Sequence, residues 1–126
     1  MNLCIDQGNS RTKIALFKKD GRIVKKLLYK SFTSADVERL FSLYPITQSI
    51  VSSVANMEPA VINALNRLSK KFVLFDHLTP LPIKNCYQTP ETLGHDRIAA
   101  AVGAAHLCPG QNLLIVDAGS AVTYDF

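Results

Sequence analysis

One short pattern occurs twice in this sequence, at positions 111 residues apart. Residues 3–8 read LCIDQG and residues 114–119 read LIVDAG, so an apolar segment ends in Asp-x-Gly each time. The likeness continues beyond the glycine, because Asn9 and Thr12 of the first copy match Ser120 and Thr123 of the second. Internal repeats of this kind indicate duplicated structural units. The chain is therefore constrained to a fold that starts the same strand and turn twice.

The chemistry of the repeated pattern points to phosphate. An aspartate at the end of a buried strand can face a crevice, and the glycine that follows lets backbone N–H groups approach an anion. A carboxylate beside phosphate is useful where a metal ion lies between them. Two such turns facing each other would hold a triphosphate from both sides. The alternative is two unrelated turns, since Asp and Gly are common turn residues.

Composition places the chain among folded proteins. Hydrophobic residues make up 48% of its 126 residues and charged residues 19%, and the mean hydropathy is +0.12, which excludes disorder as the main state. The longest uncharged apolar runs, such as residues 113–116, fall far short of the roughly 20 residues that span a bilayer. The N-terminus has no basic segment and reaches Asp6 early, so we expect no secretory signal, no membrane partner and a cytoplasmic location.

Charge and cysteine content narrow the partners further. The formal net charge is +4, and much of the excess lies in residues 18–30. A basic hairpin could touch nucleic acid, but such runs usually form a solvated face, so we expect no nucleic-acid partner. Cys4, Cys86 and Cys108 are odd in number and have no CxxC spacing, which argues against a disulfide framework and a zinc site.

The order of predicted elements favours an α/β fold with a mixed sheet. Asp20-Gly21 between two apolar segments predicts a hairpin. We predict strands over 1–5, 12–17 and 23–29, a helix capped by Ser34 that ends before Pro45, a strand over 48–54, a helix with Pro59 in its first turn, and a strand over 72–75. Three antiparallel strands followed by β-α-β fit a ribonuclease-H-like domain. A Rossmann domain fits less well, because GxGxxG is absent.

The last third of the chain contains a loop, a helix and the repeated strand. Residues 76–87 hold two prolines and are predicted to be a loop. Residues 97–107 form a helix rich in alanine and glycine, which is either a tight helix contact, such as a subunit interface, or a plain buried helix. We predict a buried strand over 113–116 and the start of another over 121–126. The domains are then 1–111, including this helix, and 112–126, the start of a second, truncated ribonuclease-H-like domain.

Three segments, in the same order, resemble motifs of the type III pantothenate kinase family, a branch of the ASKHA superfamily also described as Bvg accessory factor-like. Residues 6–13 (DQGNSRTK) resemble its first phosphate motif, 116–125 (VDAGSAVTYD) its second, and 89–97 (TPETLGHDR) its Gly-x-Asp-Arg segment. The Gly-x-Asp-Arg segment is the specific one of the three, because other ASKHA kinases lack it at this position. Ser10 and Ser120 stand where the family usually has threonine, and both keep the hydroxyl.

The resemblance implies roles for individual residues. Asp96 would be the general base that accepts the proton of the pantothenate hydroxyl, which suits a carboxylate beside a hydroxyl. The implied substrate-binding residues are Tyr87, Gly94, His95, Asp96 and Arg97, with His95 at the variable position of its motif. Without the neighbouring motifs, Gly94-His95-Asp96-Arg97 would instead indicate a helix N-terminus capped by Asp96, and Tyr87 an ordinary loop aromatic.

The same resemblance implies an ATP site and two cations. The implied ATP-binding residues are Asp6, Gln7, Gly8, Asn9, Ser10, Arg11, Thr12, Lys13 and Ser120. Asp6 would also orient a divalent cation, Mg²⁺, through the phosphates. Asp117 would bind a monovalent cation, K⁺ or NH₄⁺. The family is homodimeric, so a homodimer is the implied assembly.

The implied function is transfer of the ATP γ-phosphate to pantothenate, giving 4′-phosphopantothenate in coenzyme A biosynthesis. Members of the family have about twice this length, so we expect the chain to be the N-terminal half of such a kinase, and its activity alone stays open. One alternative is a transcriptional regulator or partner-binding domain without kinase activity. Another is a sugar or acetate kinase of the ASKHA superfamily, against which residues 94–97 argue.

Overall fold

The structure is a computed structural model that describes residues 1–53, 57–118 and 122–126. The chain divides into two compact units, unit 1 (Met1–Phe75) and unit 2 (Asp76–Phe126), and each is described by itself. The two units are defined by how compactly their residues pack, whereas the predicted boundary after residue 111 is defined by the sequence repeat. The first division does not test the second. The domains 1–111 and 112–126 therefore stay a prediction.

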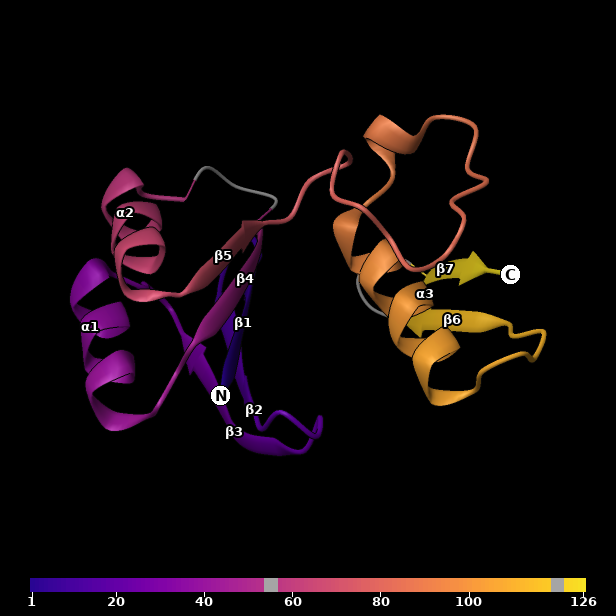
Figure 1. Ribbon diagram of the computed structural model, residues 1–126. Coiled ribbons are helices and arrows are strands. Elements are labelled where there is room, and N and C mark those ends of the chain that lie inside the picture. The colour runs from indigo at the N-terminus through magenta and orange to yellow at the C-terminus, as the bar shows by residue number, and fades with distance from the viewer. Residues whose placement is uncertain (54–56, 119–121) are drawn as a thin grey trace. The chain divides into compact units, whose positions relative to one another are not determined.

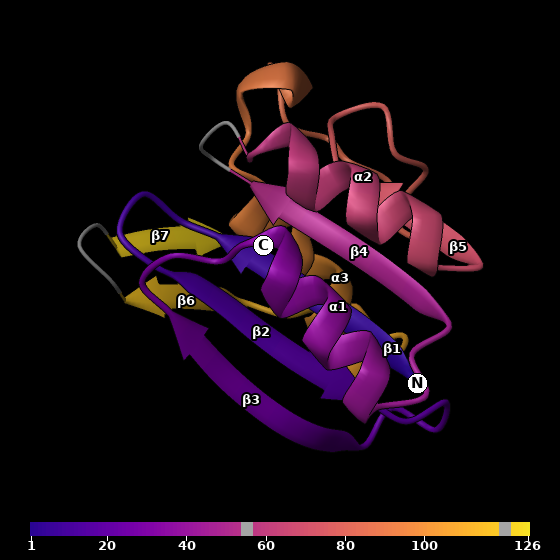
Figure 2. The ribbon, with the colours of Figure 1, turned by 90° about the vertical axis from the view of Figure 1, so that its left-hand side faces the viewer.

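Unit 1 contains a five-stranded sheet in the order β3-β2-β1-β4-β5, visible in Figure 2. The strands are β1 (Asn2–Gln7), β2 (Thr12–Phe17), β3 (Ile23–Tyr29), β4 (Gln48–Ser53) and β5 (Lys71–Leu74). The pairs β1–β2 and β2–β3 are antiparallel, whereas β1–β4 and β4–β5 are parallel. The predicted mixed α/β sheet is confirmed.

Helices α1 (Ser34–Leu43) and α2 (Pro59–Leu68) lie together on one face of this sheet (Figure 1). Alternation along β1 and β2 turns every second side chain, Leu3 and Leu16 among them, toward the helices. The buried core cluster consists of Leu3, Ile5, Ile14, Leu16, Phe32, Val37, Leu40, Ile46, Val51, Val61, Ala64 and Leu65. The cluster includes side chains of both β1 and β2, the strands that flank the turn at residues 8–11.

The cap of α1 corrects one prediction. Thr33, not Ser34, is the N-cap: its hydroxyl accepts from the Asp36 N–H at 3.4 Å, and its own N–H donates to Asp36 Oδ2 at 2.9 Å. The two bonds form a capping box, in which the capping residue stands three positions before the acidic one. The spacing to Asp36 therefore selects Thr33 over the neighbouring hydroxyl.

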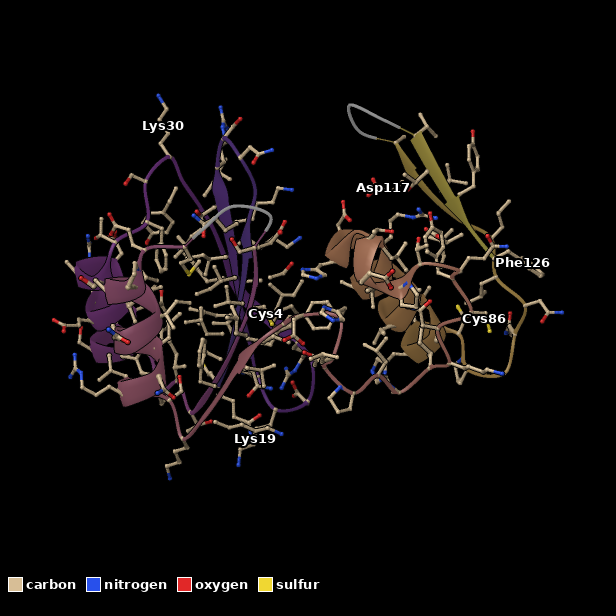
Figure 3. All side chains as sticks on the ribbon, turned by 90° about the horizontal axis from the view of Figure 1, so that it is seen from above. Cys4, Lys19, Lys30, Cys86, Asp117 and Phe126 are labelled. Atoms are coloured by element: carbon tan, nitrogen blue, oxygen red, sulfur yellow. The ribbon has the colours of Figure 1, made fainter. Side chains whose placement is uncertain are left out.

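The predicted hairpin between β2 and β3 is confirmed. Gly21 has a φ of 83°, a conformation that side chains disfavour. The Lys18 N–H donates to the Arg22 carbonyl oxygen at 2.9 Å. Lys19 lies at this turn and Lys30 at the far end of β3 (Figure 3). Lys19 and Lys30, two of the basic residues of the stretch 18–30, therefore lie at opposite ends of β3.

Unit 2 contains a 3₁₀ helix (Pro90–Thr92), α3 (His95–Leu107) and an antiparallel ribbon of β6 (Ile115–Ala118) and β7 (Val122–Asp125). Helix α3 packs against this ribbon. The buried strand predicted over 113–116 is wrong in two respects, because the strand begins at Ile115 and Val116 is 52% exposed. An apolar run predicts burial only where another element covers it, and within the described residues α3 leaves this side of β6 open.

The small-residue helix is not a plain buried helix. Ile98 is the buried residue of α3, and its alanines and glycine are half-buried or exposed. A Cβ built on Gly103 meets no atom within 4 Å, so the described chain forms no tight contact there. The alternative, a subunit interface, stays a prediction. None of the described helices is long and apolar enough to cross a membrane.

Candidate functional site

The turn between β1 and β2 and its flanking residues present one carboxylate, Asp6, and two basic side chains, Arg11 and Lys13. Asp6 lies opposite Lys13 in the strand pairing, with Lys13 Nζ 3.6 Å from Asp6 Oδ2. The Gly8 N–H donates to the Arg11 carbonyl oxygen at 3.0 Å and closes the turn. The Asp6 side chain is 50% exposed and that of Lys13 72%. Exposed ion pairs are weak, so both charges remain available to a ligand.

The other predicted residues of this turn differ in accessibility. Asn9 and Ser10 are exposed at its tip. Gln7 Oε1 accepts from the Ser53 hydroxyl at 3.1 Å, which ties the turn to β4. Thr12 is only 4% exposed, on the buried side of β2, so its side chain packs beneath the turn. A phosphate would meet the tip and the backbone before it met Thr12.

The second copy of the repeat is also an antiparallel hairpin, but its register differs. Asp117 lies opposite Thr123, whereas Asp6 lies opposite the residue after Thr12. Asp117 is exposed. Gly119 and Ser120, the latter predicted to contact ATP, lie outside the described residues. The structure thus shows a pair of antiparallel strands in both copies of the repeat, with a shift of one residue in their pairing.

The N-terminus of α3 carries the predicted general base. Gly94 is the N-cap and Asp96 stands in the first turn, a position where an acidic side chain interacts favourably with the helix dipole. Asp96 is exposed, and its Oδ1 accepts from the Arg97 backbone N–H at 2.9 Å. A Cβ on residue 94 would lie 2.5 Å from this oxygen. Glycine at 94 therefore leaves room for the observed position of the carboxylate.

Arg97 is held by a residue that the sequence reasoning did not single out. Its Nε lies 3.0 Å from Asp125 Oδ2 and its Nη2 2.5 Å from Asp125 Oδ1. The guanidinium carbon lies 5.2 Å from the centre of the Tyr87 ring, within cation–π range. Hydrogen bonding to Asp125 raises the pKa of Arg97 further above its ordinary value. The available signal for Asp125 was its place at the end of the segment 116–125.

A cavity of about 430 Å³ in unit 2 adjoins this pair. Tyr87, Arg97 and Asp125 are among its lining residues. Its other lining residues are Leu81, Ile83, Lys84, Asn85, Cys86, Leu93, Ile98, Ala101, Tyr124 and Phe126. Among the described residues of the motif at 94–97, only Arg97 contributes to the lining. The cavity suits a small molecule with an apolar body and a polar end.

The carboxylates fit the expected cations only as partial ligand sets. In residues 1–53, 57–118 and 122–126 no three His, Cys, Asp or Glu side chains gather into a metal cage. Mg²⁺ is commonly held by one or two carboxylates together with substrate phosphates, and the exposed Asp6 beside the turn fits that pattern. Asp117 likewise offers a single exposed carboxylate.

The structure brings some predicted residues together within each unit. In unit 1 it groups the turn residues with Asp6 and Lys13. In unit 2 it groups Tyr87 and Arg97 at one cavity, with Asp96 directed toward Gly94. His95, at the first position of α3, is half-buried and makes an interaction of its own. Of the predicted site residues, Ser120 is the one that has no described position.

Comparison with known proteins gives matches that cover nearly the whole chain. A family model described as type III pantothenate kinase matches residues 2–126. The type III pantothenate kinase of Phocaeicola vulgatus is 42% identical over 126 residues, which are 100% of this chain and 52% of that protein. The protein of the same name from Bacteroides fragilis ATCC 25285 is 41% identical over 127 residues, 100% of this chain and 51% of its own length. That of Christiangramia forsetii is 42% identical over 126 residues, 99% and 51% respectively.

All three matches cover only part of the relative's length. The chain spans about half the length of the curated relatives it matches, and the matched part is their N-terminal half. The family model nevertheless covers all three segments on which the resemblance rested.

Proposed function

Because the chain belongs to the type III pantothenate kinase family, we propose that it is the N-terminal half of an enzyme that transfers the γ-phosphate of ATP to pantothenate. The product would be 4′-phosphopantothenate, an intermediate of coenzyme A biosynthesis. The observation that carries the proposal is the α3 N-terminus, where the exposed Asp96 carboxylate has a defined position beside Gly94 and Arg97. This is the segment that distinguishes the family from other ASKHA kinases.

In the proposed reaction Asp96 accepts the proton of the pantothenate hydroxyl. The hydroxyl oxygen forms a bond to the γ-phosphorus as the bond from that phosphorus to the β–γ bridging oxygen breaks, and ADP leaves. Phosphoryl transfer depends mainly on positioning and charge stabilisation. The exposed carboxylate and the room that Gly94 leaves for it meet the first requirement for a base, which is access to the hydroxyl.

The turn at residues 6–13 is the proposed phosphate site. The tip of the turn would approach the triphosphate, while Arg11 and Lys13 balance its charge. Asp6 would hold Mg²⁺ together with phosphate oxygens, and the ion would there neutralise charge on the transferring phosphoryl group. Asp117 is the proposed ligand of K⁺ or NH₄⁺. A homodimer and a cytoplasmic location are further proposals, and both rest on the family resemblance.

The alternative, a regulator without kinase activity, has less support. Its basis was the basic stretch 18–30, which includes Lys19 and Lys30 (Figure 3), together with the family's description as Bvg accessory factor-like. The relatives at about 40% identity are named as kinases. A regulator of this type would bind nucleic acid in a salt-dependent manner, so a gel-shift titration with the full-length protein is expected to show no complex at 150 mM salt, roughly physiological ionic strength.

The proposal is tested with the full-length protein that contains this chain. The protein is incubated with ATP, Mg²⁺ and K⁺, and pantothenate, acetate, glucose and glycerol are offered separately. Mass spectrometry is expected to detect phosphorylated product from pantothenate alone. Phosphorylation of acetate or a sugar, with pantothenate unchanged, would assign the protein to another branch of the ASKHA kinases.

A further inference from the structure

The pair Arg97–Asp125 differs from the other ion pairs of the described residues in its burial. Both of its side chains are only 22% exposed. In the pairs Lys13–Asp6, Arg22–Asp20 and Arg67–Glu38 every side chain is about half exposed or more. Removing one partner of an enclosed pair leaves the other charge uncompensated, unlike at the surface. Asp125 is therefore more than a solvated surface charge.

The two residues come from distant parts of unit 2. Arg97 stands in the first turn of α3, and Asp125 is the last residue of β7, 28 positions later. The carboxylate thus links the segment that carries the proposed general base to the ribbon formed by the second copy of the repeat. By contrast, Asp20 and Arg22 are neighbours within one turn, and that pair links nothing beyond the turn.

The hydrogen bonds and the ring restrain the guanidinium in two directions. A guanidinium has five N–H donors in one plane. Asp125 accepts from Nε and from Nη2, and Tyr87 lies within cation–π range of the group. The donors that remain are both hydrogens of Nη1 and one of Nη2. One hydrogen of Nη1 and the remaining hydrogen of Nη2 form one edge, which has the geometry to hold an oxygen pair of a ligand.

We propose that Asp125 is a positioning residue for Arg97: it fixes the guanidinium beside Tyr87, so that the remaining edge binds an oxygen-bearing group of the acceptor substrate in the adjoining cavity. The role rests on the proposed function, since the acceptor is taken to be pantothenate. Asp125 itself need not touch the substrate. The charge of Asp125 is equal and opposite to that of Arg97. The pair therefore orients the guanidinium in the cavity without adding net charge.

The test compares the full-length wild type with Asp125→Asn, Arg97→Gln and the double variant. Asparagine keeps the size of the side chain and removes its charge. The KM for pantothenate is expected to rise on the order of 10- to 100-fold in Asp125→Asn, because misplacement of a binding group by about 1 Å has effects of this size. The KM for ATP is expected to change less than about twofold, a difference within the scatter of roughly 0.5 kcal/mol for independent sites.

The double variant separates positioning from a merely structural role. If Asp125 acts through Arg97, adding Asp125→Asn to Arg97→Gln raises the KM for pantothenate no further. The matched control is Asp20→Asn, the same change in an exposed pair, which is expected to leave both KM values unchanged. The proposal is overturned if Asp125→Asn leaves the KM for pantothenate unaltered, or if its effect is equally large with Arg97→Gln.

A measurement on the wild type covers the case in which a variant does not fold. The Arg97 Nε–H resonance in a ¹⁵N–¹H spectrum, assigned in the full-length protein, is expected to be protected from solvent exchange. Rapid exchange of this proton would overturn the proposal without any variant. Failure of the proposed function has a different signature: the wild type would form no phosphopantothenate, and the positioning role for that substrate would fall with it.

Discussion

Units 1 and 2 are held together in different ways. The core cluster contains twelve buried side chains, and all of them belong to unit 1. In residues 76–118 and 122–126 Ile98 is the one buried hydrophobic residue. Unit 2 has instead the enclosed ion pair of Arg97 and Asp125. The large apolar side chains Leu107, Leu114, Val116, Val122, Tyr124 and Phe126 of unit 2 are exposed.

This difference in packing means that the functional groups of the two units are supported in different ways. The turn at residues 6–13 stands on a sheet whose one face is fully packed, so its geometry follows from the core of unit 1. Asp96 and Arg97 stand on a helix whose position depends on a polar contact and on apolar surfaces that the described residues leave uncovered. The proposed phosphate site thus belongs to a unit with its own core cluster, whereas the proposed acceptor site belongs to a unit with one buried hydrophobic residue among those described.

The largest expected effect is on independent folding. A peptide of residues 1–75 is expected to unfold cooperatively in urea, because it contains the whole core cluster. A peptide of residues 76–126 is expected to show no cooperative transition, since a chain of about 50 residues with little core is marginal. Circular dichroism during a urea titration measures both. A cooperative transition in the peptide of residues 76–126 would contradict this contrast between the two units.

The same contrast can be measured with single leucines. Leu3 is fully buried and Leu114 is 65% exposed. Leu3→Ala is expected to lower the free energy of unfolding by about 2–5 kcal/mol, through lost burial and a cavity. Leu114→Ala, the matched control, is expected to change it by less than about 0.5 kcal/mol. Urea denaturation of the 126-residue chain gives both values, and equal losses would contradict the assignment of the core to unit 1.

The smallest effect concerns cysteine reactivity. Figure 3 shows Cys4 in the sheet of unit 1 and Cys86 in unit 2. Burial raises the pKa of the Cys4 thiol, so less of the reactive thiolate is present near pH 8 and more forms only as the pH rises. Cys86 is exposed. Peptide mapping after brief iodoacetamide treatment at pH 8 is expected to find Cys86 alkylated well before Cys4, and the reverse order would contradict the burial of Cys4.

Local patterns were sufficient to predict most of unit 1. The Asp20-Gly21 turn, the alternation in β1 and β2, and Pro59 at the start of α2 each act within a few residues. Together they predicted the mixed sheet. The choice between Thr33 and Ser34 failed because the partner, Asp36, was not weighed.

Long-range contacts limited the prediction of unit 2. The apolar run 113–116 is the same whether or not another element packs on it, so its exposure was not predictable from the run itself. The partner of Arg97 lies 28 positions away, and no local pattern links the two residues. The register shift between the two hairpins likewise depends on how the paired strands meet, which the repeat of residue types does not encode.

The central claim is that Asp96 acts as the base in phosphoryl transfer to pantothenate. The most direct measurement is the rate of 4′-phosphopantothenate formation by the full-length protein and by Asp96→Asn, with urea denaturation to compare their stability. The wild type is expected to form the product, and Asp96→Asn to lose roughly 10²- to 10⁴-fold in kcat with an unchanged unfolding midpoint. Full activity in Asp96→Asn, or no product from the wild type, would contradict the claim.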